Sequence, residues 1–242
     1  MASTIRGNLV APQEIFSSSS SQGTLLGTEA LTGDGRRFRY VLADASTAVV
    51  VGKTYQGPAE TTAWQNLACA AAAIGATSIT TTATITATAN QLAGGYVTVT
   101  ASTGAGYIYK IKGNTAASSA VCTIYLEDPI LVAMTVTSST IDICLNPYSG
   151  IILTPGSTQS AACVGVSVYP LPVSTYGWVQ VGGPVSCLID AGGGAVGQIM
   201  VVSDDTAGAA GPFETDALFP IIGTAMTGSS SGDYGLINLN LN

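Results

Sequence analysis

The chain has 242 residues, contains no histidine, and carries only seven Lys or Arg and 14 Asp or Glu residues. The missing imidazole removes the commonest proton shuttle and metal ligand near neutral pH, and few carboxylates or amines are left to build another active site. The formal net charge of −7 argues against a nucleic-acid partner, because phosphate binding needs clustered Lys and Arg. The composition therefore indicates a structural β-protein that is not an enzyme, needs no cofactor, and works through surfaces and partners.

Residues 1–32 differ in composition from the rest of the chain. They contain a run of serines at 17–21 and several glycines, and such a segment cannot bury enough apolar surface to fold alone. It is either disordered or an extended arm that a neighbour orders, and its scattered apolar residues favour the arm. Strand alternation would place Arg37 and Arg39, in the basic cluster that follows, on one face. We expect this region to make subunit or assembly contacts through Ile5, Arg6, Leu9, Val10, Ile15, Phe16, Arg36, Arg37 and Arg39.

From residue 36 onward the chain reads mainly as short strands separated by Gly, Pro and Asp turns. The one helical candidate is 59–74, which is rich in alanine and stops at Gly75. That region also contains the longest apolar run, which is far shorter than the roughly 20 residues of a membrane span. The expected strands are 38–41, 48–51, 78–88, 96–99, 107–111, 121–126, 130–136, 141–145, 151–153, 164–168, 176–181, 185–189, 198–202 and 236–241.

This pattern predicts an all-β fold with minor helix. Many short strands with regular turn signals are typical of β-sandwiches and β-barrels. We expect an extended N-terminal arm at 1–32, a β-rich domain with one short helix at 33–145, and a second β-rich domain at 146–242.

Three motifs invite a chemical interpretation, and each has a plainer one. Residues 192–197 match GxGxxG, but a strand rather than a helix follows, so a glycine-rich hairpin loop is favoured over a dinucleotide site. Glu127 and Asp128, or Asp204 and Asp205, could supply catalytic carboxylates or calcium ligands, yet both pairs read as turns. We therefore predict no catalytic, cofactor-binding or metal-binding residues.

The cysteines and one aromatic group also have two interpretations each. The five cysteines are odd in number and form no CxxC pair, so we expect free thiols, with Cys122 and Cys144 buried in apolar runs. Tyr169, Tyr176 and Trp178 could form a patch that stacks on sugars, although packing in the core or at an interface is commoner.

Several phrases of the sequence, taken together, resemble one protein family over most of residues 6–241. The set resembles the capsid decoration (cement) proteins of tailed bacteriophages. It consists of residues 6–9 (RGNL), 52–58 (GKTYQGP), 93–97 (AGGYV), 106–111 (GYIYKI), 126–130 (LEDPI), 146–148 (NPY), 176–180 (YGWVQ) and the closing segment 222–241.

The resemblance implies a β-rich homotrimer on the outer capsid surface of a virion, made in the host cytoplasm. There it would clamp neighbouring copies of the major capsid protein against internal DNA pressure, with no nucleic acid or membrane as direct partner. On this interpretation, deletion of residues 2–32 would leave a folded body that binds capsids poorly.

Two other functions stay open from the sequence. One is a head-fibre or tail-associated receptor binder that holds carbohydrate near Tyr176 and Trp178. The other is a depolymerase built on carboxylates such as Glu127 and Asp204.

Overall fold

The computed structural model describes residues 8–9, 12–135, 139–214 and 219–241. Nearly all of its regular structure is β-strand, which confirms the predicted all-β class. The chain forms two compact units, a larger one from residues 1–59 and 147–242 and a smaller one from residues 60–146. The expected domains 1–32, 33–145 and 146–242 do not coincide with these units, because the early strands pair with strands from the second half of the chain. Within the described residues, no helix is long and apolar enough to cross a membrane.

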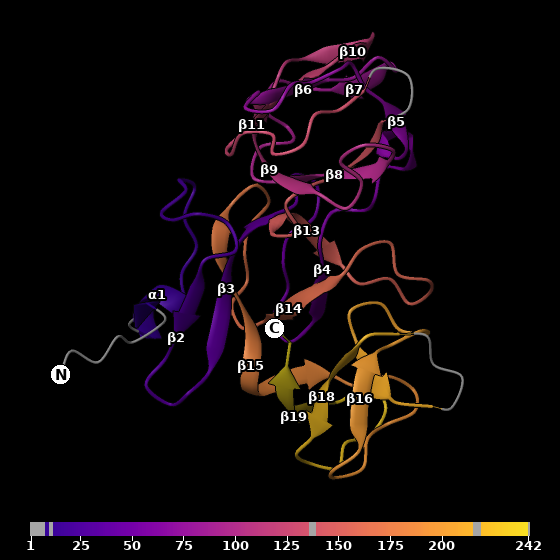
Figure 1. Cartoon of the computed structure of the whole chain (residues 1–242). Coiled ribbons are helices and arrows are strands. Elements are labelled where there is room, and N and C mark those ends of the chain that lie inside the picture. The colour runs from indigo at the N-terminus through magenta and orange to yellow at the C-terminus, as the bar shows by residue number, and fades with distance from the viewer. Residues whose placement is uncertain (1–7, 10–11, 136–138, 215–218, 242) are drawn as a thin grey trace, which may run out of the picture. The chain divides into compact units, whose positions relative to one another are not determined.

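A closed ring of strands forms the first part of the larger unit (Figure 1). Pairing runs from β3 to β13, β4, β14 and β15 and back to β3, so each strand has a partner on both sides. Inward-facing residues such as Val41, Tyr55, Ile151 and Val179 fill the ring. The strands are β3 (Arg37–Ala43), β4 (Thr54–Gln56), β13 (Ser149–Leu153), β14 (Cys163–Ser167) and β15 (Tyr176–Leu188).

The long strand β15 also belongs to a second ring. Its first half pairs with β3, and from Gly182 onward it pairs with β19. Pairing continues through β18 and β16 to β17, and the bridge between Ala210 and Ile189 leads back to the end of β15. This ring encloses its own apolar core. Its further strands are β16 (Ile199–Val202), β17 (Ala210–Pro212), β18 (Ile221–Ala225) and β19 (Tyr234–Asn240).

The smaller unit is a curled sheet in the order β5-β12-β8-β9-β11-β6. The bridge between Cys69 and Thr81 joins the ends of β5 and β6, so this sheet also closes. A separate pair, β7 with β10, lies in the same unit. The strands are β5 (Leu67–Ala68), β6 (Ser78–Thr80), β7 (Ile85–Ala87), β8 (Tyr96–Ala101), β9 (Ile108–Asn114), β10 (Ala117–Ala120), β11 (Thr123–Leu126) and β12 (Thr140–Cys144).

The predicted helix at 59–74 is wrong. The segment holds only one short 3-10 helix, η1 (Thr62–Trp64), followed by β5. Asn66 has φ of 51°, which ends any helix at this point. Beyond it, Leu67 and Cys69 are buried while Ala68 is exposed, which is the two-residue period of a strand. Pairing with distant strands therefore overrides the weak helical preference of alanine.

The N-terminal segment packs on the chain's own sheet. Strand β1 (Asn8–Leu9) runs parallel to β2 (Glu29–Leu31), and β2 pairs with β3. Between them lies the one-turn helix α1 (Pro12–Ile15), whose last residue is fully buried against Phe38 and Trp178. Between α1 and β2 the segment runs mostly through turns and bends, and its hydrogen bonds are made within this chain. For the described residues this corrects the expectation of an extended arm that is disordered or ordered by a neighbour.

Candidate functional site

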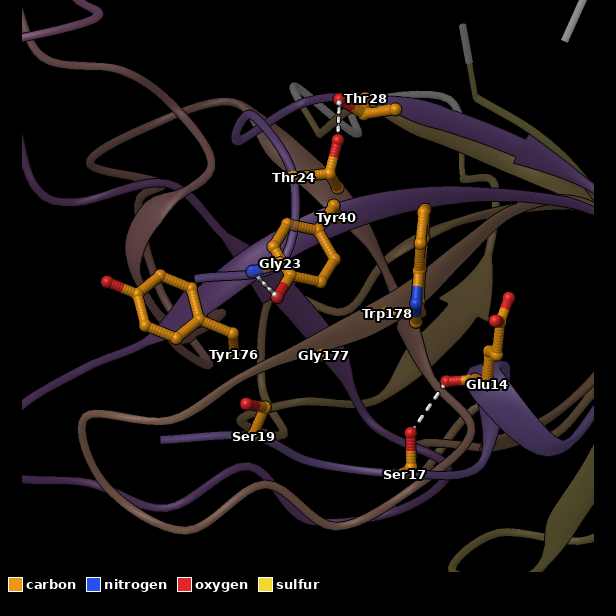
Figure 2. A pocket seen from close by; sticks show the side chains of 10 residues that line it. All are labelled: Glu14, Ser17, Ser19, Gly23, Thr24, Thr28, Tyr40, Tyr176, Gly177 and Trp178. Atoms are coloured by element: carbon orange, nitrogen blue, oxygen red, sulfur yellow. Dashed lines mark hydrogen bonds between the residues drawn. The ribbon is translucent and has the colours of Figure 1, made fainter. Parts of the chain in front are cut away.

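A hollow of about 360 Å³ lies where the N-terminal segment crosses β3 and β15 (Figure 2). We call it the aromatic groove, because three aromatic side chains form its floor. Its lining residues come from the N-terminal segment, from β3 and from the beginning of β15, and they are Glu14, Ser17, Ser19, Gly23, Thr24, Thr28, Tyr40, Tyr176, Gly177 and Trp178.

Strand register sets the position of the aromatic rings. Tyr40 of β3 stands opposite Trp178 of β15, and strand alternation places Tyr176 on the same face. The Tyr40 and Trp178 rings meet edge to face with their centres 5.0 Å apart, whereas the Tyr40 and Tyr176 rings stack at 6.0 Å. Tyr40 and Trp178 are buried, and Tyr176 is half-buried. The groove therefore has a rigid aromatic floor with the Tyr176 ring partly open to solvent.

The rim of the groove is built from hydroxyls and one carboxylate. The Ser17 hydroxyl donates to the backbone oxygen of Glu14 at 2.9 Å. Ser19 exchanges two backbone hydrogen bonds with Tyr176, at 3.0 and 2.8 Å. The backbone N–H of Gly23 donates to the Tyr40 hydroxyl at 3.0 Å, and the Thr24 hydroxyl lies 3.2 Å from that of Thr28. These bonds fix the segment over the aromatic floor.

Sequence reasoning found part of this groove. It selected Tyr176 and Trp178, but it grouped them with Tyr169, which instead packs against the core of the first ring. It missed Tyr40 and the whole rim, because the register of β3 against β15 and the fold of a serine-rich segment are not local properties. The packing interpretation also holds, since Trp178 is only 8% exposed.

Three of the four arginines of the predicted interface, those at 36, 37 and 39, each have a partner within the chain. Arg36 pairs with Asp34 at 2.8 Å, and Arg39 pairs with Glu29 at 3.0 Å. Arg37 donates to the backbone oxygen of Leu241 at 3.2 Å. Arg37 and Arg39 flank the buried Phe38, so they share a face as expected. The Arg36 pair lies within the turn between β2 and β3, the Arg39 pair joins β3 to β2, and Arg37 joins β3 to the residue that follows β19.

The remaining interface candidates fall into three groups. Ile5, Arg6 and Val10 lie outside the described residues. Leu9 is the second residue of strand β1. Ile15 is buried, which leaves Phe16, at 42% exposure, as the one of these apolar side chains shown to face solvent.

Three carboxylates gather at the end of the second ring. Oxygens of Asp190, Asp204 and Asp205 lie within 4.8 Å of one another, a geometry that could hold a metal ion. Burial raises the pKa of Asp190, the neighbouring charges of Asp205 and Asp204 raise it further, and hydrogen bonds from Ser203 and from the backbone N–H of Gly192 oppose this. Sequence reasoning found the adjacent pair but missed Asp190, which the turn after β15 brings to them.

The other predicted features are resolved as follows. Glu127 lies in the smaller unit and pairs with Lys110 at 3.2 Å. Strand β16 follows the glycine-rich run, which confirms that 192–197 is a loop. The loop is not a hairpin, because β15 pairs with β3, β14 and β19 whereas β16 pairs with β17 and β18. All five cysteines are free, and Cys122 is buried as predicted. Cys144 is exposed instead, because it lies opposite Tyr96 on the outer face of the sheet.

No protein-family model matches this sequence, and the searches of curated proteins and of solved structures gave no match either.

Proposed function

We propose that this protein is a non-enzymatic structural protein of a phage virion, a capsid cement that binds the outside of an icosahedral head. It would bridge neighbouring copies of the major capsid protein. The resemblance of its sequence phrases to decoration proteins suggests this role, and the surface of the smaller unit supports it.

One observation carries the proposal, which is the outer face of the neighbouring strands β8, β9 and β11. Val97, Tyr109 and Ile124 point into the core from these strands, while Tyr96, Ile108 and Tyr125 are exposed on the opposite face. We call these last three residues the outer patch. Ile108 is 61% exposed. Lys110 of β9 stands opposite Tyr96, and its ion-pair partner Glu127 directly follows β11.

The outer patch has the composition of an interface. Aromatic side chains are enriched where proteins meet, and exposed apolar side chains beside a few polar groups mark binding surfaces. A chain with few charged residues also repels its neighbours weakly. A protein that binds only the assembled shell stabilises that shell by mass action, and repetition over a lattice makes weak contacts collectively strong.

The test is binding to heads of the source phage that lack this protein, measured by sedimentation. We expect the wild-type protein to bind saturably and Tyr96→Ser/Ile108→Ser to bind about tenfold more weakly, which is ~1.4 kcal/mol. The matched control is Ile221→Ser in the larger unit, which should bind like the wild type. The Ile221 side chain is 57% exposed, close to the 61% of Ile108. Failure of the wild-type protein to bind would contradict the function, and equal binding by the double variant would exclude the outer patch.

A further inference from the structure

We propose that the aromatic groove is a binding site for one neutral hexopyranose unit of a glycan. This inference goes beyond the proposed capsid role and does not depend on it. It rests on the floor, the rim, the size of the hollow and the pairing of the strands beneath it.

The floor suits the apolar face of a sugar ring. A pyranose presents C–H groups on its faces, and these pack on the electron-rich face of an aromatic ring. Tyr176 offers a partly exposed ring that the buried Tyr40 supports by stacking at 6.0 Å. Trp178 closes the floor edge-on against Tyr40. Because these rings are already fixed in position, a ligand loses little free energy in ordering them.

The rim suits the hydroxyls of a sugar. The hydroxyls of Ser17 and Ser19 already donate to backbone oxygens of their own segment, and the Thr24 hydroxyl pairs with that of Thr28. Each of them keeps a lone pair that can accept a hydrogen bond from a sugar hydroxyl. Glu14 is exposed, and none of the ion pairs among the described residues involves it. A carboxylate is a strong acceptor for the paired hydroxyls of a pyranose. Figure 2 shows Glu14, Ser17 and Ser19 around the same hollow as the three rings.

Charge and size narrow the ligand class. The lining contains one carboxylate and neither Lys nor Arg, so an anionic sugar or a phosphate would be repelled. A volume of about 360 Å³ is near the lower end of ligand pockets, which span roughly 300–1,000 Å³. The hollow therefore fits a single sugar ring of a longer glycan.

The strands under the groove argue against an added peptide strand. A peptide that extends a sheet needs a strand with unpaired backbone groups. Here β3 pairs with β15 on one side and with β2 and β13 on the other. Strand β15 pairs with β3 along one edge and with β14 along the other. Side chains, not backbone edges, are what the groove presents.

The first test uses fluorescence of Trp178. The chain has two tryptophans, so Trp64→Phe leaves Trp178 as the one reporter, and Trp64 lies in the smaller unit. The probes are methyl β-D-glucopyranoside, methyl β-D-galactopyranoside, methyl α-D-mannopyranoside and N-acetyl-D-glucosamine, with methyl β-D-glucuronide as the anionic comparison. We expect a saturable change with at least one neutral sugar and at least tenfold weaker binding of the glucuronide. No saturable change with any neutral sugar would overturn the proposal.

Two variants locate the binding. Tyr176→Ala should weaken binding of the neutral sugar at least tenfold, whereas Tyr107→Ala, which removes an exposed tyrosine stacked on Tyr109 in the smaller unit, should leave it unchanged. Glu14→Gln changes an exposed side chain and should leave folding intact. It should reduce the difference in affinity between the neutral glucoside and the anionic glucuronide. The proposed site would be overturned if Tyr176→Ala bound the neutral sugar with unchanged affinity. It would also be overturned if Glu14→Gln left the difference in affinity between glucoside and glucuronide unchanged. Sedimentation with phage heads should be unaffected by either groove variant, which separates this proposal from the capsid role.

Discussion

Asp190 is the buried member of the cluster that it forms with Asp204 and Asp205, so its negative charge is the one that costs the folded state most. Burial and two neighbouring carboxylates raise its pKa, although it accepts a hydrogen bond from the backbone N–H of Gly192 at 3.0 Å. A carboxyl with a raised folded-state pKa favours folding when protonated and costs stability once ionised. Its cost is therefore absent well below the ordinary aspartate pKa of 3.8 and grows as the pH rises through the folded-state pKa.

Replacing Asp190 with asparagine should raise the free energy of unfolding at pH 7. Asparagine keeps the oxygen that accepts from Gly192, but it removes the buried charge and its repulsion with Asp204 and Asp205. The gain should vanish near pH 3, where the wild-type carboxyl is protonated. Urea unfolding at both pH values measures this, and Asp204→Asn, at an exposed position, should give a smaller gain. A less stable Asp190→Asn protein at pH 7 would contradict this account.

At the scale of elements, the sequence predicts strands far better than it predicts their partners. The predicted strands 107–111 and 121–126 overlap β9 and β11, in which burial on one face gives a two-residue period. The helix prediction at 59–74 failed because β5 is stabilised by pairing with a strand some 70 positions later, from which Thr140 faces Ala68. The sequence likewise indicated only part of the aromatic groove. Tyr176 and Trp178 of its floor lie in a predicted strand, whereas its rim depends on contacts between distant parts of the chain.

Helix α1 anchors the N-terminal segment through one side chain. Ile15 is fully buried against Phe38, Tyr40 and Trp178, so Ile15→Ala should lower the free energy of unfolding by about 2–4 kcal/mol, as buried Ile→Ala changes do. Its neighbour Phe16 is 42% exposed, and Phe16→Ala should cost much less. Denaturant unfolding compares the two. Equal stabilities of the two variants would contradict the packing described here.

The same packing revises the expected effect of deleting residues 2–32. That deletion removes Ile15 and Ala30 from a core cluster and takes away β2, a partner of β3. We now expect the shortened protein to be destabilised, so its loss of capsid binding would not isolate a role for the arm. Deletion of residues 2–7 removes none of the described residues and is the cleaner comparison.

At the scale of the whole molecule, closed rings and a low content of charged residues are compatible with the proposed role, in which the protein works by contact. Ring closure gives strands partners on both sides, which limits uncontrolled pairing between sheet edges. Under the proposed function, side chains such as those of the outer patch would be the means of association. Sequence phrases could suggest the assembly role, but neither pattern nor composition identifies which face meets the capsid, because that choice depends on the partner's surface.

Quantitative mass spectrometry of purified particles of the source phage tests the central claim most directly. The measured quantity is the copy number of this protein relative to the major capsid protein. A cement protein that bridges capsid subunits should be present in near-stoichiometric amounts. Absence from the particle, or only a handful of copies per head, would contradict the proposed function.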